Sequence, residues 1–100
     1  MELSELRKQI NEADIEILNA FRKRMEISRN IAEVKCQRHL PLVNLLRENE
    51  HMEELKMLSG DLGNYTERLF KLLMDLSKEE QMKIFDANGL DESGKGKALL

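Results

Sequence analysis

A regular repeat of apolar residues in the first third of the chain constrains the fold more than any other feature. Between residues 3 and 38 the apolar positions recur in steps of three and four, at Leu3, Leu6, Ile10, Ala13, Ile17, Ala20, Ile27, Ile31 and Val34. No Gly or Pro interrupts this run before Pro41. The period predicts a single long amphipathic helix with a heptad seam. About 35 residues at 1.5 Å each make a rod of roughly 50 Å.

A rod of that length is too long for the core that this chain can build alone. A compact domain of about 100 residues has a radius of gyration of only about 13 Å. We therefore expect the seam of the first helix to be completed by a second copy of the chain.

Two shorter helices are predicted after the rod. Pro41 disfavours helix in the residue before it, so the first helix should end by Leu40. Asn44 is a suitable N-cap for a second helix. Residues 59–63 read as a turn, and Asn64 with Glu67 would form a capping box that opens a third helix.

The C-terminal segment of the chain differs from the rest in composition and in its apolar pattern. Residues 86–100 read DANGLDESGKGKALL, with three Gly and no apolar period. We predict a helical domain over residues 1–85 and a flexible tail or linker stub over residues 86–100.

The bulk composition excludes several classes of protein. The formal net charge is -3, which argues against a general nucleic-acid binder. No apolar run approaches the roughly 20 residues needed to span a bilayer, so no membrane partner is expected. The single cysteine, Cys36, fits a reducing compartment, and we expect a cytoplasmic protein.

A cation interrupts the apolar seam. Arg24 occupies a seam position, where a guanidinium should be excluded or paired. Lys35 lies eleven residues later, close to three helical turns, and so projects from nearly the same face. Arg7 lies about 25 Å away along the axis and points roughly 100° elsewhere. Only a second, antiparallel copy could place its Arg7 beside these two cations.

Each of these polar residues also has a purely structural interpretation. A lone Arg in a seam often fixes the register of a coiled coil, and Lys35 near a helix end can snorkel. Ser77 and Gln81 continue the apolar stripe of the third helix from Leu73, although Ser is a common small core residue. Taken together, the set suits the binding of a multiply anionic molecule. Cys36, His39 and His51 do not have the spacing of a zinc site.

The order and spacing of these residues resemble the all-helical chorismate mutases. The resemblance covers about residues 3–85 and rests on Leu6-Arg7-x-x-Ile10 with Asp14, Arg24, Lys35-x5-Pro41-x2-Asn44-x2-Arg47-Glu48, and Ser77-x3-Gln81. It implies an all-α fold with three helices per chain, a very long first helix and an intertwined homodimer. The two equivalent sites would be shared between the chains.

The resemblance also implies a role for each residue. Lys35, Gln81 and Arg24 would be catalytic, with Lys35 and Gln81 at the ether oxygen of chorismate and Arg24 on a carboxylate. The substrate-binding set would be Arg7 of the partner chain with Arg24, Lys35, Asn44, Arg47, Glu48, Ser77 and Gln81. The reaction would be the Claisen rearrangement of the chorismate dianion to prephenate, with no cofactor and no metal.

One departure from the family pattern and two other functions stay open at this point. Asn44 stands where the family commonly has Asp, so any contribution from that carboxylate is lost. An isochorismate-pyruvate lyase would reuse Arg24, Lys35 and Gln81 on the same fold, whereas Ser77 and Glu48 favour the mutase. A non-catalytic helical dimerisation or regulatory module is the remaining alternative.

Overall fold

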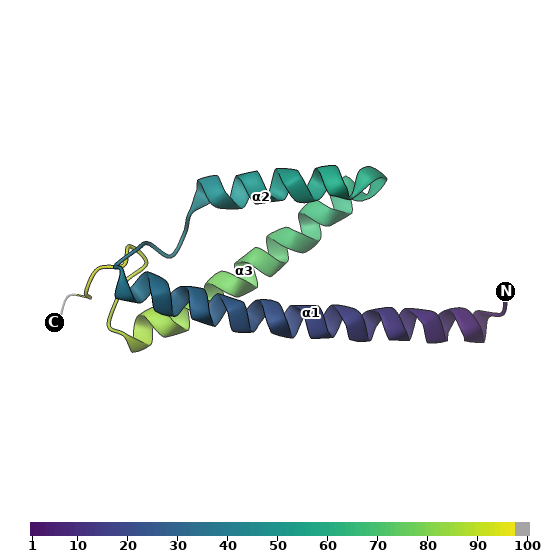
Figure 1. Ribbon diagram of the computed structural model, residues 1–100, viewed down its shortest axis with the longest axis horizontal. Helices are drawn as coiled ribbons and strands as arrows, with labels where there is room; N and C mark the ends of the chain where they lie inside the picture. Colours follow the sequence, from purple (N-terminus) through teal and green to yellow (C-terminus); the bar gives the residue numbers. More distant parts are fainter. Residues whose placement is uncertain (98–100) are drawn as a thin grey trace.

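The computed structural model describes residues 1–97, and these are almost entirely helical (Figure 1). The elements follow in the order α1 (Leu3–Gln37), α2 (Leu45–Leu58), the short 3₁₀ helix η1 (Gly60–Leu62) and α3 (Gly63–Ala87). Among the described residues, the only β pairing is one isolated bridge, between Leu90 and Gly96. The predicted all-α fold with three helices and a very long first helix is confirmed.

The molecule is elongated because α1 extends far beyond the other helices. Its principal extents are 63 × 25 × 21 Å and its radius of gyration is 17.5 Å, above the roughly 13 Å of a compact domain of this length. In Figure 1, α2 runs back along α1, and α3 returns to meet the C-terminal half of α1. Every residue from 1 to 20 is exposed, so the N-terminal half of the apolar seam has no partner within residues 1–97.

Helix α3 holds the other two helices together. Within the described chain it packs against both α1 and α2, whereas no Cα atom of α1 comes within 8 Å of one in α2. The space between α1 and α2 is therefore bounded by α3 on its third side, and this arrangement allows a pocket among the three helices.

The observed starts of α2 and α3 agree only in part with those predicted from the sequence. Asn44 caps α2, since its Oδ1 accepts a hydrogen bond of 3.1 Å from the backbone N–H of Arg47. The predicted capping box at Asn64 and Glu67 is wrong, because α3 begins at Gly63 and has no side-chain cap. Helix η1 leads directly into α3, so Asn64 already lies inside the helix.

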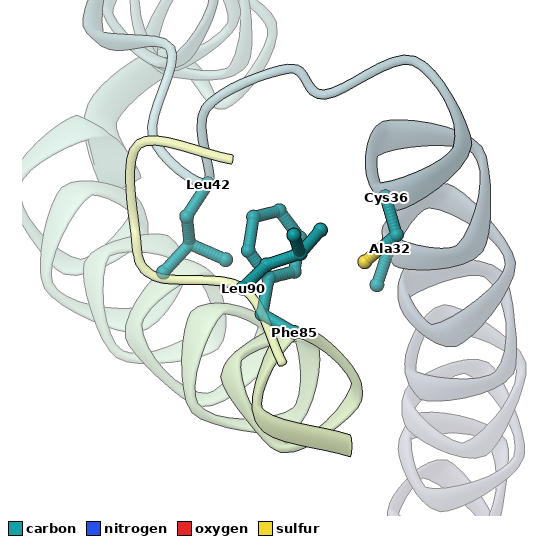
Figure 2. Close-up of a cluster of buried hydrophobic side chains, with 5 residues drawn as sticks. All are labelled: Ala32, Cys36, Leu42, Phe85 and Leu90. Atoms are coloured by element: carbon teal, nitrogen blue, oxygen red, sulfur yellow. The ribbon is translucent and has the colours of Figure 1, made fainter. Parts of the chain in front are cut away.

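The hydrophobic core lies at one end of the molecule. Ala32, Cys36, Leu42, Phe85 and Leu90 are its buried members, and Phe85 is fully buried. Figure 2 shows Leu42, Phe85 and Leu90 gathered together, with Ala32 and Cys36 of α1 facing them. The core thus joins the end of α1, the end of α3 and the connection between α1 and α2.

The segment after residue 85 differs from the flexible tail that the sequence predicts. Asp86 and Ala87 continue α3, and residues 88–97, which we call the C-terminal hook, fold back on the core. Leu90 is buried in the core, and the carbonyl of Glu92 accepts a 2.8 Å hydrogen bond from the N–H of Leu42. The segment is ordered by contacts distant in sequence, which apolar periodicity does not detect. Residues 98–100 lie outside the described residues, and a link to a further domain stays a prediction.

Candidate active site

A pocket of about 410 Å³ opens among the three helices. Helix α1 contributes one wall, α3 a second, and α2 with its preceding connection the third. The lining residues are Arg24, Ile27, Ser28, Ile31, Lys35, Leu42, Asn44, Arg47, Glu48, His51, Met74, Ser77, Lys78 and Gln81. Seven of the eight residues predicted to bind substrate are in this set, and Arg7 is not.

Arg24 is paired across to α3 rather than excluded from the seam. Its Nη1 donates to Ser77 Oγ at 2.6 Å and to the carbonyl of Leu73 at 3.2 Å. Ser77 Oγ also accepts from Ser28 Oγ at 3.0 Å. These contacts use the two N–H groups of Nη1, which leaves three of the five N–H donors of the guanidinium. Ser77 accepts in both of its contacts, so its own hydroxyl proton can donate to a ligand.

Lys35 is held by two acceptors at the other end of the pocket. Its Nζ donates to Gln81 Oε1 at 3.0 Å and to the carbonyl of Leu42 at 2.7 Å. An ammonium has three donors, so one N–H remains for a ligand. Because Gln81 uses Oε1 to accept from Lys35, its Nε2 is the atom that can donate into the pocket. An ammonium can only donate, so the oxygen of the buried Gln81 amide must face Lys35.

Burial changes the acidity of both pocket cations on α1. Desolvation lowers the pKa of Arg24 and that of Lys35, because burial penalises the charged form. For Lys35 the carboxylate of Glu48 opposes the effect and raises the pKa. The ammonium of Lys35 is thus a partly desolvated cation, whose interaction with a ligand anion is stronger than in water.

Helix α2 brings an ion pair to the pocket. Glu48 Oε1 lies 3.0 Å from Lys78 Nζ of α3, and both side chains are largely shielded, with 21% and 29% of their surface exposed. Asn44 and Arg47 are exposed at the pocket edge. The side-chain oxygen of Asn44 accepts from Arg47 N, so Asn at this position serves as the cap of α2.

Arg7 is the one predicted site residue that the fold leaves apart. It lies in the exposed first half of α1, 17 residues before Arg24, which corresponds to about 25 Å along the helix axis. Its separation agrees with the geometric argument that only another copy of the chain could bring an Arg7 to this pocket.

Three groups that form contacts in the site were not predicted from the sequence. Lys78 pairs with Glu48, Ser28 bonds to Ser77, and the backbone carbonyl of Leu42 anchors Lys35. Ser28 could have been found, because it lies on the same helical face as Arg24 and Lys35. Lys78 follows Ser77 directly and reads as a surface residue. A backbone acceptor leaves no signal in the sequence.

The pocket is cationic. Arg24, Lys35, Arg47 and Lys78 face a single carboxylate, that of Glu48, among the lining residues. The arrangement can bind a dianion of modest size and place hydrogen-bond donors at both of its ends. Among residues 1–97, no group of three or more His, Cys, Asp or Glu side chains is placed to hold a metal ion. In the same residues no helix has the length and apolar character required to cross a membrane.

Comparison with known proteins assigns the family. The family model described as chorismate mutase type II matches residues 6–82. The chain belongs to the chorismate mutase type II family. This match covers all of α2, most of α1 and α3, and every residue that lines the pocket.

Three curated relatives carry this family's name. The bifunctional chorismate mutase/prephenate dehydratase of Aquifex aeolicus is 36% identical over 61% of this chain and 17% of its own length. The enzyme of the same name from Buchnera aphidicola is 33% identical over 85% of this chain and 23% of its own length. The chorismate mutase of Methanocaldococcus jannaschii is 26% identical over 84% of this chain and 88% of its own length. The chain therefore spans about a fifth of the two bifunctional relatives, and no solved structure matches it significantly.

Proposed function

We propose that the protein is a chorismate mutase, which converts chorismate to prephenate. The observation that carries this proposal is the pairing of Lys35 Nζ with Gln81 Oε1 at 3.0 Å, in a pocket that also holds Arg24. The pair presents one N–H of Lys35 and the amide nitrogen of Gln81 toward the same space. Two donors at one point suit an oxygen that gains negative charge in a transition state.

The residue types fit a reaction that is unimolecular. The rearrangement breaks the carbon–oxygen ether bond as a carbon–carbon bond forms, without a nucleophile or an external proton. Catalysis then consists of holding the flexible dianion in its folded, reactive conformer. Lys35 and Gln81 would donate to the ether oxygen, whose charge increases as the bond breaks.

The remaining lining residues would hold the two carboxylates and the hydroxyl of the substrate. The N–H groups of Arg24 that do not bind Ser77 or Leu73 would clamp a carboxylate, with the hydroxyl of Ser77 as a second donor. Glu48 would accept a hydrogen bond from the ring hydroxyl, and Arg47 would border that end of the pocket. Lys78 would orient the carboxylate of Glu48 through their 3.0 Å ion pair.

The protein is proposed to act as an intertwined homodimer. The exposed apolar side chains on the first half of α1 support this, since Leu3, Ile10 and Ile17 are each about 60% exposed within one chain. A contiguous apolar face of this kind typically marks an interface. In an antiparallel pairing of two α1 helices, Arg7 of the partner would supply the second carboxylate clamp. The cytoplasmic location expected from the single cysteine belongs to the same proposal.

Product analysis tests the proposed activity directly. The purified protein is incubated separately with chorismate and with isochorismate, and prephenate and pyruvate are measured. The mutase assignment requires prephenate from chorismate. Release of pyruvate from isochorismate, without prephenate from chorismate, would identify a lyase instead. If neither substrate is converted, the protein would instead be a non-catalytic helical dimerisation or regulatory module.

A further inference from the structure

The C-terminal hook, residues 88–97, is held in a fixed shape by its own backbone. Lys97 N donates to the carbonyl of Gly89 at 2.8 Å, and Asp91 N donates to that of Lys95 at 2.8 Å. The carboxylate of Asp91 accepts from the N–H groups of Ser93 and Lys95 at 2.9 and 3.2 Å. These bonds explain how a segment without apolar periodicity keeps a defined conformation.

The hook contacts the α1–α2 connection at three points. Glu92 O accepts from Leu42 N at 2.8 Å, and His39 Nδ1 donates to Gly94 O at 2.9 Å. Leu90 and Leu42 are both buried in the core, which Figure 2 shows around Phe85. The connection is thus fixed from one side by residues about 50 positions later in the sequence.

The end of α1 depends on the same contacts. His39 is the only non-glycine residue with a positive φ among the described residues, at 52°. Leu40 N donates to Lys35 O at 2.9 Å, which is the bond of a helix C-terminus closed by a left-handed residue. Glycine usually takes this position, because a residue with a side chain is strained there. The hydrogen bond from the His39 ring to Gly94 O holds the turn in this conformation.

Gly94 is the residue that allows the hook to approach. Its φ is +83°, and a Cβ atom built there would lie 2.5 Å from Leu40 O and 2.8 Å from the backbone carbonyl carbon of His39. Both atoms belong to backbone, so neither can move aside as a flexible side chain would. The close approach therefore requires glycine at position 94.

Leu42 connects the hook to the catalytic lysine. Its N–H donates to Glu92 O, and its carbonyl accepts from Lys35 Nζ at 2.7 Å. We propose that the C-terminal hook is a positioning element of the active site, which fixes Leu42 and thereby the ammonium of Lys35. This inference rests on the proposed function, because its effect is measured on the step that Lys35 is assigned. The hook itself does not line the pocket.

Three glycines of the hook provide a matched set of variants. Gly94→Ala introduces both the positive-φ strain and the collision with the connection. Gly89→Ala introduces strain alone, because φ is +70° and its Cβ would meet nothing within 4 Å. Gly96→Ala introduces neither. A role limited to overall stability predicts different folded fractions but the same kcat per folded molecule for Gly94→Ala and Gly89→Ala, whereas positioning of Lys35 predicts a lower kcat for Gly94→Ala alone.

The test measures kcat and KM for chorismate and amide hydrogen exchange at Leu42. Gly94→Ala should lower kcat by roughly ten- to a hundredfold, as expected for a misplaced catalytic group, with KM within about twofold because Arg24 is untouched. Its Leu42 amide should exchange faster than in Gly89→Ala and Gly96→Ala, whose kcat should stay near the wild-type value. Equal kcat for Gly94→Ala and Gly89→Ala, or unchanged exchange at Leu42, would overturn the proposal.

A second variant covers the case in which Gly94→Ala does not fold. His39→Gly keeps the left-handed turn and removes the ring that donates to Gly94 O. It should lower kcat severalfold with an unchanged KM, and a wild-type kcat would overturn the proposal. An inactive wild-type protein would instead refute the proposed function, and the exchange of Leu42 would then decide the positioning claim alone.

Discussion

Lys35 of α1 and Gln81 of α3 meet at 3.0 Å across the pocket, although 46 residues separate them in the sequence. The contact fixes both donors that the proposed reaction needs at its ether oxygen. It depends on α3 packing along the second half of α1, where the core also lies. The first half of α1 carries Arg7 and is free of the other helices in one chain. Catalysis in this account therefore requires the folded monomer for Lys35 and Gln81, and a second chain for Arg7.

Mixing two inactive variants tests whether the site is shared. Arg7→Ala and Lys35→Ala should each lose most activity alone. When they are unfolded together in equal amounts and refolded, about a quarter of the sites should contain both intact residues, since the two chains of a dimer pair at random. Activity should recover to about that fraction. Recovery should not occur when either variant is refolded alone, and failure of the mixture to recover would place both residues in one chain.

The fall in activity at high pH, which is the alkaline limb of the pH profile, should reflect the loss of the proton from Lys35. The ammonium must be protonated to donate to the ether oxygen, and burial lowers its pKa below the ordinary 10.5. As pH rises through this lowered pKa, the proton is lost and kcat/KM, which reports the free enzyme, should fall at a lower pH than for a solvated lysine. Lys35→Arg keeps its charge and should lack this limb. A limb at or above 10.5 in the wild type would contradict the assignment.

Removal of the Glu48 carboxylate should move that limb. The negative charge of Glu48 raises the pKa of Lys35, so Glu48→Gln should shift the fall in kcat/KM to lower pH. Glu50→Gln, on the exposed part of α2, is the control and should leave the profile unchanged. A limb that stays in place in Glu48→Gln would show that the two groups do not interact in the working enzyme.

Lys78 should contribute to affinity more than to turnover. It adds a cation to the pocket and pairs with Glu48, while 29% of its side chain stays exposed. Lys78→Met should raise KM for chorismate by roughly tenfold or less, and because its side chain is largely shielded, high salt should reduce this effect only in part. Lys71→Met, exposed on the same helix, should have no effect. A loss confined to kcat would assign Lys78 to the chemical step instead.

Local patterns in the sequence predicted a large part of this architecture. The heptad seam predicted α1 because its period extends over many turns, and Asn44 predicted the start of α2 because capping needs only neighbouring residues. The eleven-residue spacing of Arg24 and Lys35 placed both on one wall of the pocket for the same reason. Helical geometry is local, so sequence spacing determines it.

The features that the sequence did not reveal depend on contacts between distant segments. The C-terminal hook is ordered by the bond from Leu42 N to Glu92 O and by the approach of Gly94 to the connection. These involve backbone atoms, which are the same in every residue. The partner of Lys78 could not be predicted either, because it requires the position of α2 relative to α3.

Lys35→Ala removes from the pocket the ammonium on which the proposed catalysis depends. A continuous assay of chorismate loss gives kcat and KM for the wild type and for this variant, with Lys23→Ala, an exposed lysine of α1, as the control. We expect turnover by the wild type and by Lys23→Ala, and a kcat for Lys35→Ala lower by about 10²–10³-fold, the usual cost of removing one donor from a developing oxyanion. A Lys35→Ala variant that folds and keeps the wild-type kcat would contradict the proposed role of Lys35.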